Sequence, residues 1–231
     1  MTHRVYPVVI AFVRLFWRFL GLRFTIQGSE HVPRSGGAIM AINHIGYLDF
    51  AISGTAALPA KRYVRYMAKK QIFDHKISGP LMRGMHHISV DRDAGSASFV
   101  AALRALKAGE IVGIFPEATI SKSFEIKALK SGAARLAIGA NVPVLPTIVW
   151  GSQRIWTKGR KRDFGRNKFP ISIYVGEPLD FNRETEVELA EAQIKSALEK
   201  LLRKVQSEYP DEHVGQWWAP ARLGGTAPTL E

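Results

Sequence analysis

The sequence contains no cysteine among its 231 residues. This absence excludes disulfide bonds, metal sites built on thiolates and a cysteine nucleophile. It does not decide the redox compartment of the protein. Any covalent enzyme intermediate would need a different nucleophile.

The sequence also lacks an uninterrupted apolar run of about 20 residues, which a membrane-spanning helix requires. The apolar stretch 5–22 is broken by Arg14 and Arg18, and no small-residue cleavage site of a secretory signal follows it. The two arginines are four residues apart and therefore share one face of a helix. Three aromatic side chains project elsewhere: Phe12, Phe16 and Phe19. We predict that residues 1–22 form an amphipathic helix lying in a membrane interface, with a helix packed on the protein core as the alternative.

Acidic residues are scarce, 20 against 32 lysines and arginines, which gives a net charge of +12. The excess lies in three clusters: residues 1–23 with four basic and no acidic residues, 60–92 with eight against two, and 154–170 with seven against one. Such clusters attract nucleic acid, an anionic membrane or a phosphorylated substrate, unless they are merely solvated. Because an amphipathic helix accompanies them, we expect an anionic membrane surface as the partner and no nucleic acid.

Short apolar runs alternate with helical patterns along residues 23–207, and 46% of the chain is hydrophobic, enough for a packed core. Strands are predicted at 38–44, 87–90, 111–115, 144–150 and 171–175, and helices at 49–58, 96–107 and 127–140. A last helix is expected to begin near Thr185, which forms a capping box with Glu188, and to end before Pro210. The pattern predicts one α/β domain with a mostly parallel or mixed sheet covered by helices. We expect the tail, residues 208–231, to be loosely held, with Trp217 and Trp218 as the residues that could dock it.

One segment joins a predicted strand to a predicted helix and carries a base beside a carboxylate. It reads Asn43-His44-Ile45-Gly46-Tyr47-Leu48-Asp49. Sites in α/β folds gather at the carboxyl ends of strands. His44 can act as a general base near neutral pH, and Asp49 can accept a hydrogen bond that orients the imidazole. The segment has no serine, so His44 would activate a hydroxyl of the substrate. A structural hydrogen-bonded pair is the alternative; a metal site with His86 and His87 matches no standard zinc spacing.

Two further segments place polar residues after apolar strands. Arg92 follows the strand 87–90 and could hold a phosphate, or it could pair with a neighbouring aspartate. Glu117 and Thr119 follow the strand 111–115, where a hydroxyl and backbone N–H groups could also bind phosphate.

Together, four segments resemble the motifs of the glycerolipid acyltransferases. The family pattern is N-H-x-x-x-x-D, an arginine at a strand end, F-P-E-G-T and V-P-V-x-P, and all four occur here in order between Asn43 and Pro146. The resemblance implies that His44 is the catalytic base and Asp49 its orienting carboxylate. It implies acceptor-binding roles for Asn43, Arg92, Glu117, Thr119 and Lys130. The apolar segment 142–146 would be a wall for an acyl chain or plain strand packing.

The sequence departs from the family pattern at two places. Gly46 stands where many members have serine, and Ala118-Thr119-Ile120 replaces Gly-Thr-Arg. The arginine position is therefore Ile120, and one phosphate-binding charge is missing. Lys122, Lys127 or Lys130 could supply it, or the acceptor could carry its phosphate differently.

The resemblance implies an O-acyltransferase that moves a fatty acyl group from acyl-CoA or acyl-carrier protein to the free hydroxyl of 1-acylglycerol-3-phosphate, giving phosphatidic acid. Another lysophospholipid or a glycolipid acceptor is the alternative. No cofactor and no metal are expected. The expected location is the cytoplasmic face of the cell membrane, as a peripheral or monotopic protein.

Overall fold

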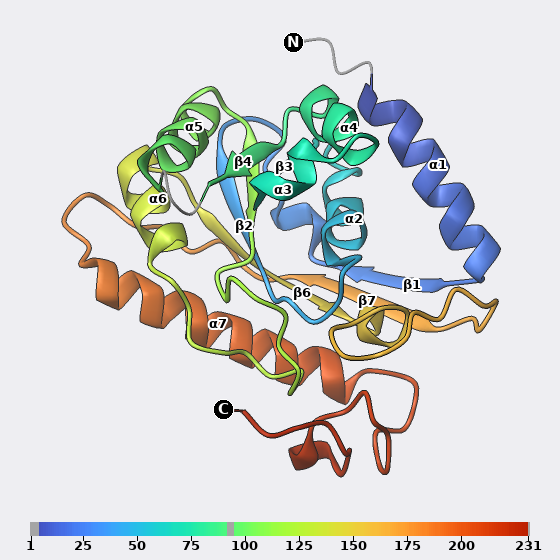
Figure 1. The fold of residues 1–231 in the computed structure, drawn as a ribbon. Helices are drawn as coiled ribbons and strands as arrows, with labels where there is room; N and C mark the ends of the chain where they lie inside the picture. The colour runs from blue at the N-terminus through green and yellow to red at the C-terminus, as the bar shows by residue number, and fades with distance from the viewer. Residues whose placement is uncertain (1–4, 92–94, 231) are drawn as a thin grey trace.

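The protein, described here by a computed structural model over residues 5–91 and 95–230, is built on one seven-stranded sheet with helices on both faces (Figure 1). The strands are β1 (Arg23–Gln27), β2 (Ala38–Ile42), β3 (Val64–Lys69), β4 (Ile88–Val90), β5 (Ile111–Ile114), β6 (Val144–Trp150) and β7 (Pro170–Val175). The α-helices are α1 (Val5–Leu20), α2 (Asp49–Ser53), α3 (Lys70–Asp74), α4 (Ser78–Gly84), α5 (Gly95–Lys107), α6 (Gly132–Ala140) and α7 (Val187–Ser207). Short 3-10 turns are η1 (Ser29–His31), η2 (Gly54–Ala57), η3 (Ser152–Arg154) and η4 (Ala221–Leu223).

The strand order is β1-β7-β6-β2-β5-β3-β4, and strands β2 to β6 are parallel. β7 runs antiparallel to β6, and β1 runs parallel to β7. The predicted α/β fold with a mixed sheet is therefore confirmed. Because β6, β2 and β5 are neighbours and parallel, their carboxyl ends meet at one edge in the middle of the sheet, which is where binding sites of such folds lie.

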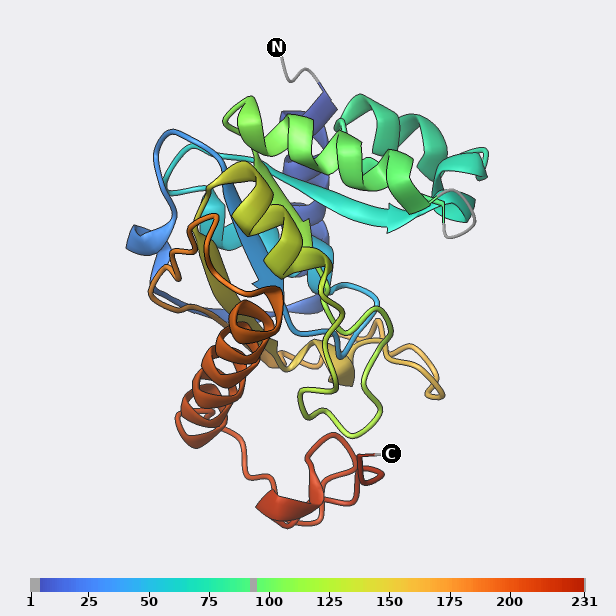
Figure 2. The same cartoon turned by 90° about the vertical axis from the view of Figure 1, so that its left-hand side faces the viewer.

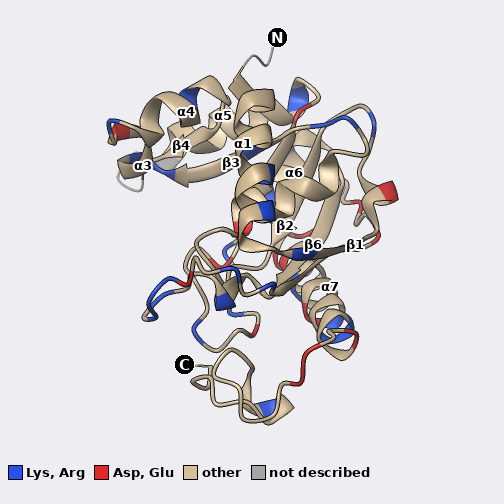
Figure 3. Cartoon of the chain, turned by 90° about the vertical axis from the view of Figure 1, so that its right-hand side faces the viewer, with Lys and Arg blue, Asp and Glu red and all other residues tan. Residues whose placement is uncertain are grey.

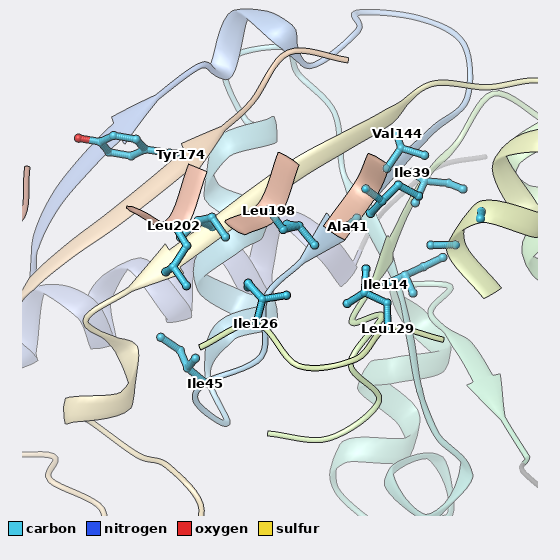
Figure 4. Close-up of a cluster of buried hydrophobic side chains, with 14 of the residues drawn as sticks. Ile39, Ala41, Ile45, Ile114, Ile126, Leu129, Val144, Tyr174, Leu198 and Leu202 are labelled. Carbon is cyan, nitrogen blue, oxygen red and sulfur yellow. The ribbon is translucent and has the colours of Figure 1, made fainter. Parts of the chain in front are cut away.

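The core lies on both faces of the central strands. Every residue of β2, β5 and β6 is buried, as expected for parallel strands covered on both sides. Ile39 and Ala41 point to the side covered by α5, α6 and α7, where Leu198 and Leu202 of α7 meet them (Figure 4). Met40 of the same strand points to the opposite side, toward α1 and α2.

Helix α1 has two apolar faces with different surroundings. Trp17 and Leu20 are buried against the domain, and Phe16 packs beside them. A second stripe faces outward, with exposures between 65% and 70%: Val8, Phe12, Leu15 and Phe19. The alternative of a helix packed on the protein core thus describes the inner face, to which Phe16 also belongs. Contact of the outer face with a membrane stays a prediction. Within the described residues, no helix combines the length and the apolarity needed to cross a membrane.

Several local predictions need correction. Helix α7 begins at Val187 without a side-chain cap, because the Thr185 hydroxyl bonds Asn182 instead of the helix N-terminus. Helix α6 begins only at Gly132, since the residues before it form an extended loop. The sequence does not predict strands β1 and β3 or helices α3 and α4, because these elements are short and their few apolar residues are separated by polar, basic or glycine residues.

The tail is packed on the domain, contrary to the expectation of a loose segment (Figure 2). Trp218 is buried, and its carbonyl accepts a hydrogen bond from Gln153 at 3.1 Å. Arg222 reaches the loop after β5, where its Nε lies 2.6 Å from the Glu125 carboxylate. The tail therefore braces the loops at the carboxyl edge of the sheet.

Candidate functional site

The site is centred on His44, two residues after the end of β2. Its Nδ1 lies 3.0 Å from Oδ2 of Asp49, the first residue of α2. The ring is partly exposed, with 22% of the side chain accessible, whereas the Asp49 side chain is fully buried. Since the carboxylate engages Nδ1, Nε2 is the nitrogen that remains for a substrate proton. The predicted pairing of base and carboxylate is thus present in the fold.

The Asp49 carboxylate is held by four donors. Oδ2 also accepts the backbone N–H groups of Ile45 at 2.7 Å and Gly46 at 2.8 Å. Oδ1 accepts the hydroxyl of Ser152, which follows β6, at 2.5 Å. A buried carboxylate with this many donors is held in one orientation. The sequence reasoning missed Ser152, because 103 residues separate it from Asp49.

Asn43 anchors the start of the loop 43–49, which carries His44 and leads to Asp49. Its side chain is fully buried, donates to the Val149 carbonyl at 3.0 Å and accepts from the Val149 N–H at 2.8 Å. These bonds fix the end of β2 on β6. The predicted contact of Asn43 with substrate stays a prediction.

Glu117 lies beside His44, after the end of the neighbouring strand β5. Its Oε1 accepts the backbone N–H of His44 at 2.8 Å, and its Oε2 accepts the N–H of Lys127 at 3.1 Å. Burial raises the pKa of this carboxyl from 4.5 to about 7, although the two N–H groups lower it. Glu117 therefore ties the loop 43–49 to the loop after β5. Its predicted contact with the acceptor stays a prediction.

The loop after β5 offers a hydroxyl and an ammonium group at its surface. Thr119 is exposed, and Lys127 Nζ donates to its Oγ1 at 2.5 Å. Ile120, at the position of the family arginine, is buried. Lys122 and Lys130 are exposed, and the Lys130 backbone N–H bonds the Pro116 carbonyl at 2.9 Å. Of the three candidate lysines, Lys127 is the one that meets Thr119.

Ala118 stands in the loop where the family pattern has glycine. Its φ is 60°, a left-handed conformation that glycine adopts freely and alanine does not. The conformation at Ala118 is therefore one that the glycine of the family pattern would adopt without strain.

Arg92, predicted to bind phosphate, lies outside the described residues. Strand β4, which precedes it, is parallel to β3, and β3 is parallel to β5. The carboxyl end of β4 therefore belongs to the same edge of the sheet as the site.

An apolar groove of about 750 Å³ runs between the inner face of α1 and the domain. Its walls come from four regions: Val9, Val13 and Phe16 of α1, Phe24 and Ile26 of β1, Leu48 and Phe50 next to Asp49, and Leu81 and Met85 near α4. Two aromatic contacts connect the groove to the base, because Tyr66 of the groove stacks on Phe115 and Phe115 lies 4.3 Å from the His44 ring. The predicted wall at 142–146 does not line it, and Val144 and Leu145 are core residues.

The described residues contain no group of three or more His, Asp or Glu side chains arranged to hold a metal ion. His87, considered with His44 as a ligand, is buried, and its Nδ1 accepts the N–H of Tyr66 at 3.0 Å. Independence from metal stays a prediction for the activity assay.

Comparisons with known proteins agree with this geometry. Residues 23–150 match the family model described as Acyltransferase. The 1-acyl-sn-glycerol-3-phosphate acyltransferase of Bacillus subtilis is 32% identical over 158 residues, which cover 67% of this chain and 72% of that protein. The enzyme of the same name from Limnanthes douglasii is 31% identical over 165 residues, 69% of this chain and 56% of that protein. The crystal structure of a 1-acyl-sn-glycerophosphate acyltransferase from Thermotoga maritima superposes with a TM-score of 0.68 at 19% identity, covering 86% of this chain and 81% of that one, which supports the fold.

Proposed function

Since the chain belongs to the acyltransferase family, we propose that it transfers a fatty acyl group from a thioester to the free hydroxyl of 1-acylglycerol-3-phosphate, giving phosphatidic acid. The observation that carries the proposal is the His44–Asp49 pair, tied through Glu117 to a loop that presents a hydroxyl and an ammonium group. A base and a phosphate-binding loop at one edge of the sheet are what this reaction needs.

In the proposed mechanism, His44 Nε2 removes the proton of the acceptor hydroxyl as its oxygen attacks the thioester carbon. Asp49 stabilises the imidazolium that forms and keeps Nδ1 protonated. The carbon–sulfur bond then breaks, and the leaving thiolate accepts from Nε2 the proton that came from the acceptor hydroxyl. The chain needs no covalent acyl-enzyme in this scheme, and no metal or cofactor.

We place the acceptor phosphate at the loop after β5. Lys127 and Thr119 present a charge and a hydroxyl there, and Arg92 is the second cation proposed for this site. Lys127 thereby takes over the role of the arginine that the family pattern has at position 120. Ile120 is buried and offers no charge to a phosphate at the position of the family arginine. The second candidate acceptor is therefore another lysophospholipid or a glycolipid, with its phosphate placed differently.

Replacing Lys127 is expected to weaken acceptor binding selectively. Lys127→Ala should raise the KM for 1-acylglycerol-3-phosphate about tenfold, because a charge-assisted hydrogen bond to phosphate is lost. The KM for the acyl donor should stay unchanged. Lys122→Ala is the matched control, since Lys122 is an exposed lysine of the same loop. Equal effects on both KM values would remove Lys127 from the acceptor site.

We propose that the outer face of α1 lies in an anionic membrane surface and that the groove beneath it receives the acyl chain. The exposed phenylalanines of α1 suit a helix at the lipid headgroups. Its arginines, without acidic residues in the helix, suit anionic headgroups (Figure 3). Exposed apolar residues continue beyond α1, at Ile72 and Ile77. Ile72 also lines the groove, so a chain could pass from the bilayer into it. The cytoplasmic face of the cell membrane is the proposed location.

Removing two aromatic side chains from the outer face of α1 should release the protein from vesicles. Phe12→Ser with Phe19→Ser is expected to lower binding to phosphatidylglycerol vesicles at least about tenfold, since each phenylalanine loses its apolar burial. Leu189→Ser is the control, because Leu189 is also an exposed apolar residue, at 51%, but belongs to α7. Sedimentation at two salt concentrations measures the effect. Unchanged binding of the double variant, or binding to nucleic acid instead of vesicles at matched salt, would contradict the proposal.

The proposed activity is tested by incubating the purified protein with labelled acyl-CoA or acyl-carrier protein and a panel of lysolipids. Phosphatidic acid from 1-acylglycerol-3-phosphate, identified by mass, is the expected product. A product from another lysolipid alone would support the second candidate acceptor. The two donor arms identify the acyl carrier.

A further inference from the structure

The hydroxyl of Ser152 makes a buried hydrogen bond to the carboxylate of the catalytic pair. Its Oγ lies 2.5 Å from Oδ1 of Asp49, and both residues are fully buried. From this geometry we infer that Ser152 is a positioning residue, which holds the Asp49 carboxylate in the orientation that aligns His44. The inference rests on the proposed roles of His44 and Asp49.

The backbone around Ser152 fixes the position of this hydroxyl. Strand β6 ends at Trp150, and Gly151 turns the chain with a φ of 97°. A Cβ atom at Gly151 would lie 2.2 Å from the Pro170 carbonyl oxygen, so the turn requires glycine at this place. The side chain of Gln153 accepts the Gly151 N–H at 2.8 Å and closes the turn. Ser152 is therefore aimed at Asp49 by a rigid element.

Gly46 leaves the space that the Ser152 hydroxyl needs. A Cβ atom at Gly46 would lie 3.0 Å from Ser152 Oγ, 3.1 Å from the Trp156 carbonyl oxygen and 3.2 Å from Asp49 Oδ1. The φ of Gly46 is not left-handed, so space alone decides which residue fits here. A hydroxyl at position 46 and one at position 152 would thus compete for the same carboxylate oxygen. In this chain the hydroxyl comes from Ser152, in the turn after β6.

The segment that follows Ser152 holds the loop 43–49 by two more hydrogen bonds. The Tyr47 N–H donates to the Trp156 carbonyl at 3.0 Å, and the Thr157 hydroxyl donates to the Ile45 carbonyl at 2.6 Å. These two bonds hold the backbone of the loop, whereas the Ser152 bond reaches the carboxylate itself. Removal of Thr157's hydroxyl is therefore a structural control for removal of Ser152's.

Loss of the Ser152 hydroxyl should act on the chemical step. Oδ1 would be buried without a donor, so the carboxylate could rotate and its charge would attract the imidazolium more strongly. Substrate binding should be unaffected, because a fully buried hydroxyl does not contact substrate. The expected pattern is a lower kcat with unchanged KM values, together with an altered pH dependence.

The experiment compares Ser152→Ala, Thr157→Val and His44→Ala in one acyl-transfer assay, with kcat and kcat/KM measured across pH. Ser152→Ala is expected to lower kcat about tenfold and to move the acidic limb of the kcat/KM profile to higher pH. Thr157→Val should leave that limb in place. In the double variant Gly46→Ser with Ser152→Gly, the hydroxyl comes from the other side, and kcat should recover relative to Ser152→Ala.

Each result decides one claim. Wild-type kcat and pH profile in folded Ser152→Ala, with His44→Ala inactive, would overturn the role of Ser152 and leave the proposed function standing. A wild-type kcat in folded His44→Ala would instead defeat the proposed function. If Ser152→Ala does not fold, the double variant decides: a folded double variant with kcat near wild type supports the inference, and a folded but impaired one overturns it.

Discussion

His44→Ala is expected to lower kcat at least about a hundredfold, the usual contribution of a positioned general base. The reason is geometric: with Nδ1 held by Asp49, Nε2 is the imidazole nitrogen available to the acceptor hydroxyl. Alanine leaves the hydroxyl to react without a base. The KM values should change little, because the ring receives a proton and does not anchor either substrate. Steady-state kinetics with varied donor and acceptor measure both quantities.

His31→Ala is the control for this substitution. His31 lies 2.9 Å from the carbonyl oxygen of Val175, the last residue of β7, and has no part in the site. Its loss should leave kcat unchanged. A folded His44→Ala protein with the kcat of the wild type would refute the catalytic role. A lowered melting temperature beside that kcat would show that the pair is structural, the alternative that the sequence left open.

The sequence predicted those features of the site that depend on neighbours in the chain. His44 and Asp49 are five residues apart, so a short loop after any strand brings them together. The nearness of Glu117 follows from a second strand ending in the same parallel sheet. The resemblance to the family motifs supported the His44–Asp49 pair and the place of Glu117 beside it.

Contacts that depend on strand order could not be predicted in the same way. Ser152 reaches Asp49 only because β6 pairs with β2, and no local pattern specifies that neighbour. The tail was misjudged for a related reason: its glycines and prolines suggested a loose segment, while buried Trp218 and the ion pair of Arg222 with Glu125 hold it in place. Likewise, periodicity gave α1 an apolar side but not the division into an inner and an outer face.

The stability of the protein is expected to depend on pH through Glu117. The pKa of its carboxyl is about 7 in the folded protein against an ordinary value of 4.5, with burial as the largest cause. A carboxyl with a raised pKa holds its proton in the folded state, so its contribution is fully present at low pH and is lost as pH rises through 7. The loss amounts to about 3 kcal/mol between pH 4 and pH 8.

Glu117→Gln should remove this pH dependence, because the amide cannot ionise. At pH 4 the neutral carboxyl and the amide each offer one acceptor to the N–H groups of His44 and Lys127, so the two proteins should be similar in stability. Toward pH 8 the difference in unfolding free energy should shift by about 3 kcal/mol in favour of the glutamine variant. Urea unfolding at pH 4, 6 and 8 measures this difference, and the other titrating groups cancel in the comparison.

Glu177→Gln provides the baseline for this experiment, since Glu177 is an exposed glutamate whose loss changes the net charge equally. Its difference from the wild type should stay constant across the three pH values. A constant difference for Glu117→Gln as well would mean that folding leaves the pKa of the Glu117 carboxyl unchanged, and would contradict the prediction. The high-pH gain in stability should be accompanied by lower activity, because an ionised glutamate accepts both N–H groups while the amide opposes one of them. The site therefore keeps a buried carboxylate that costs stability at neutral pH, where it fixes the backbone of His44.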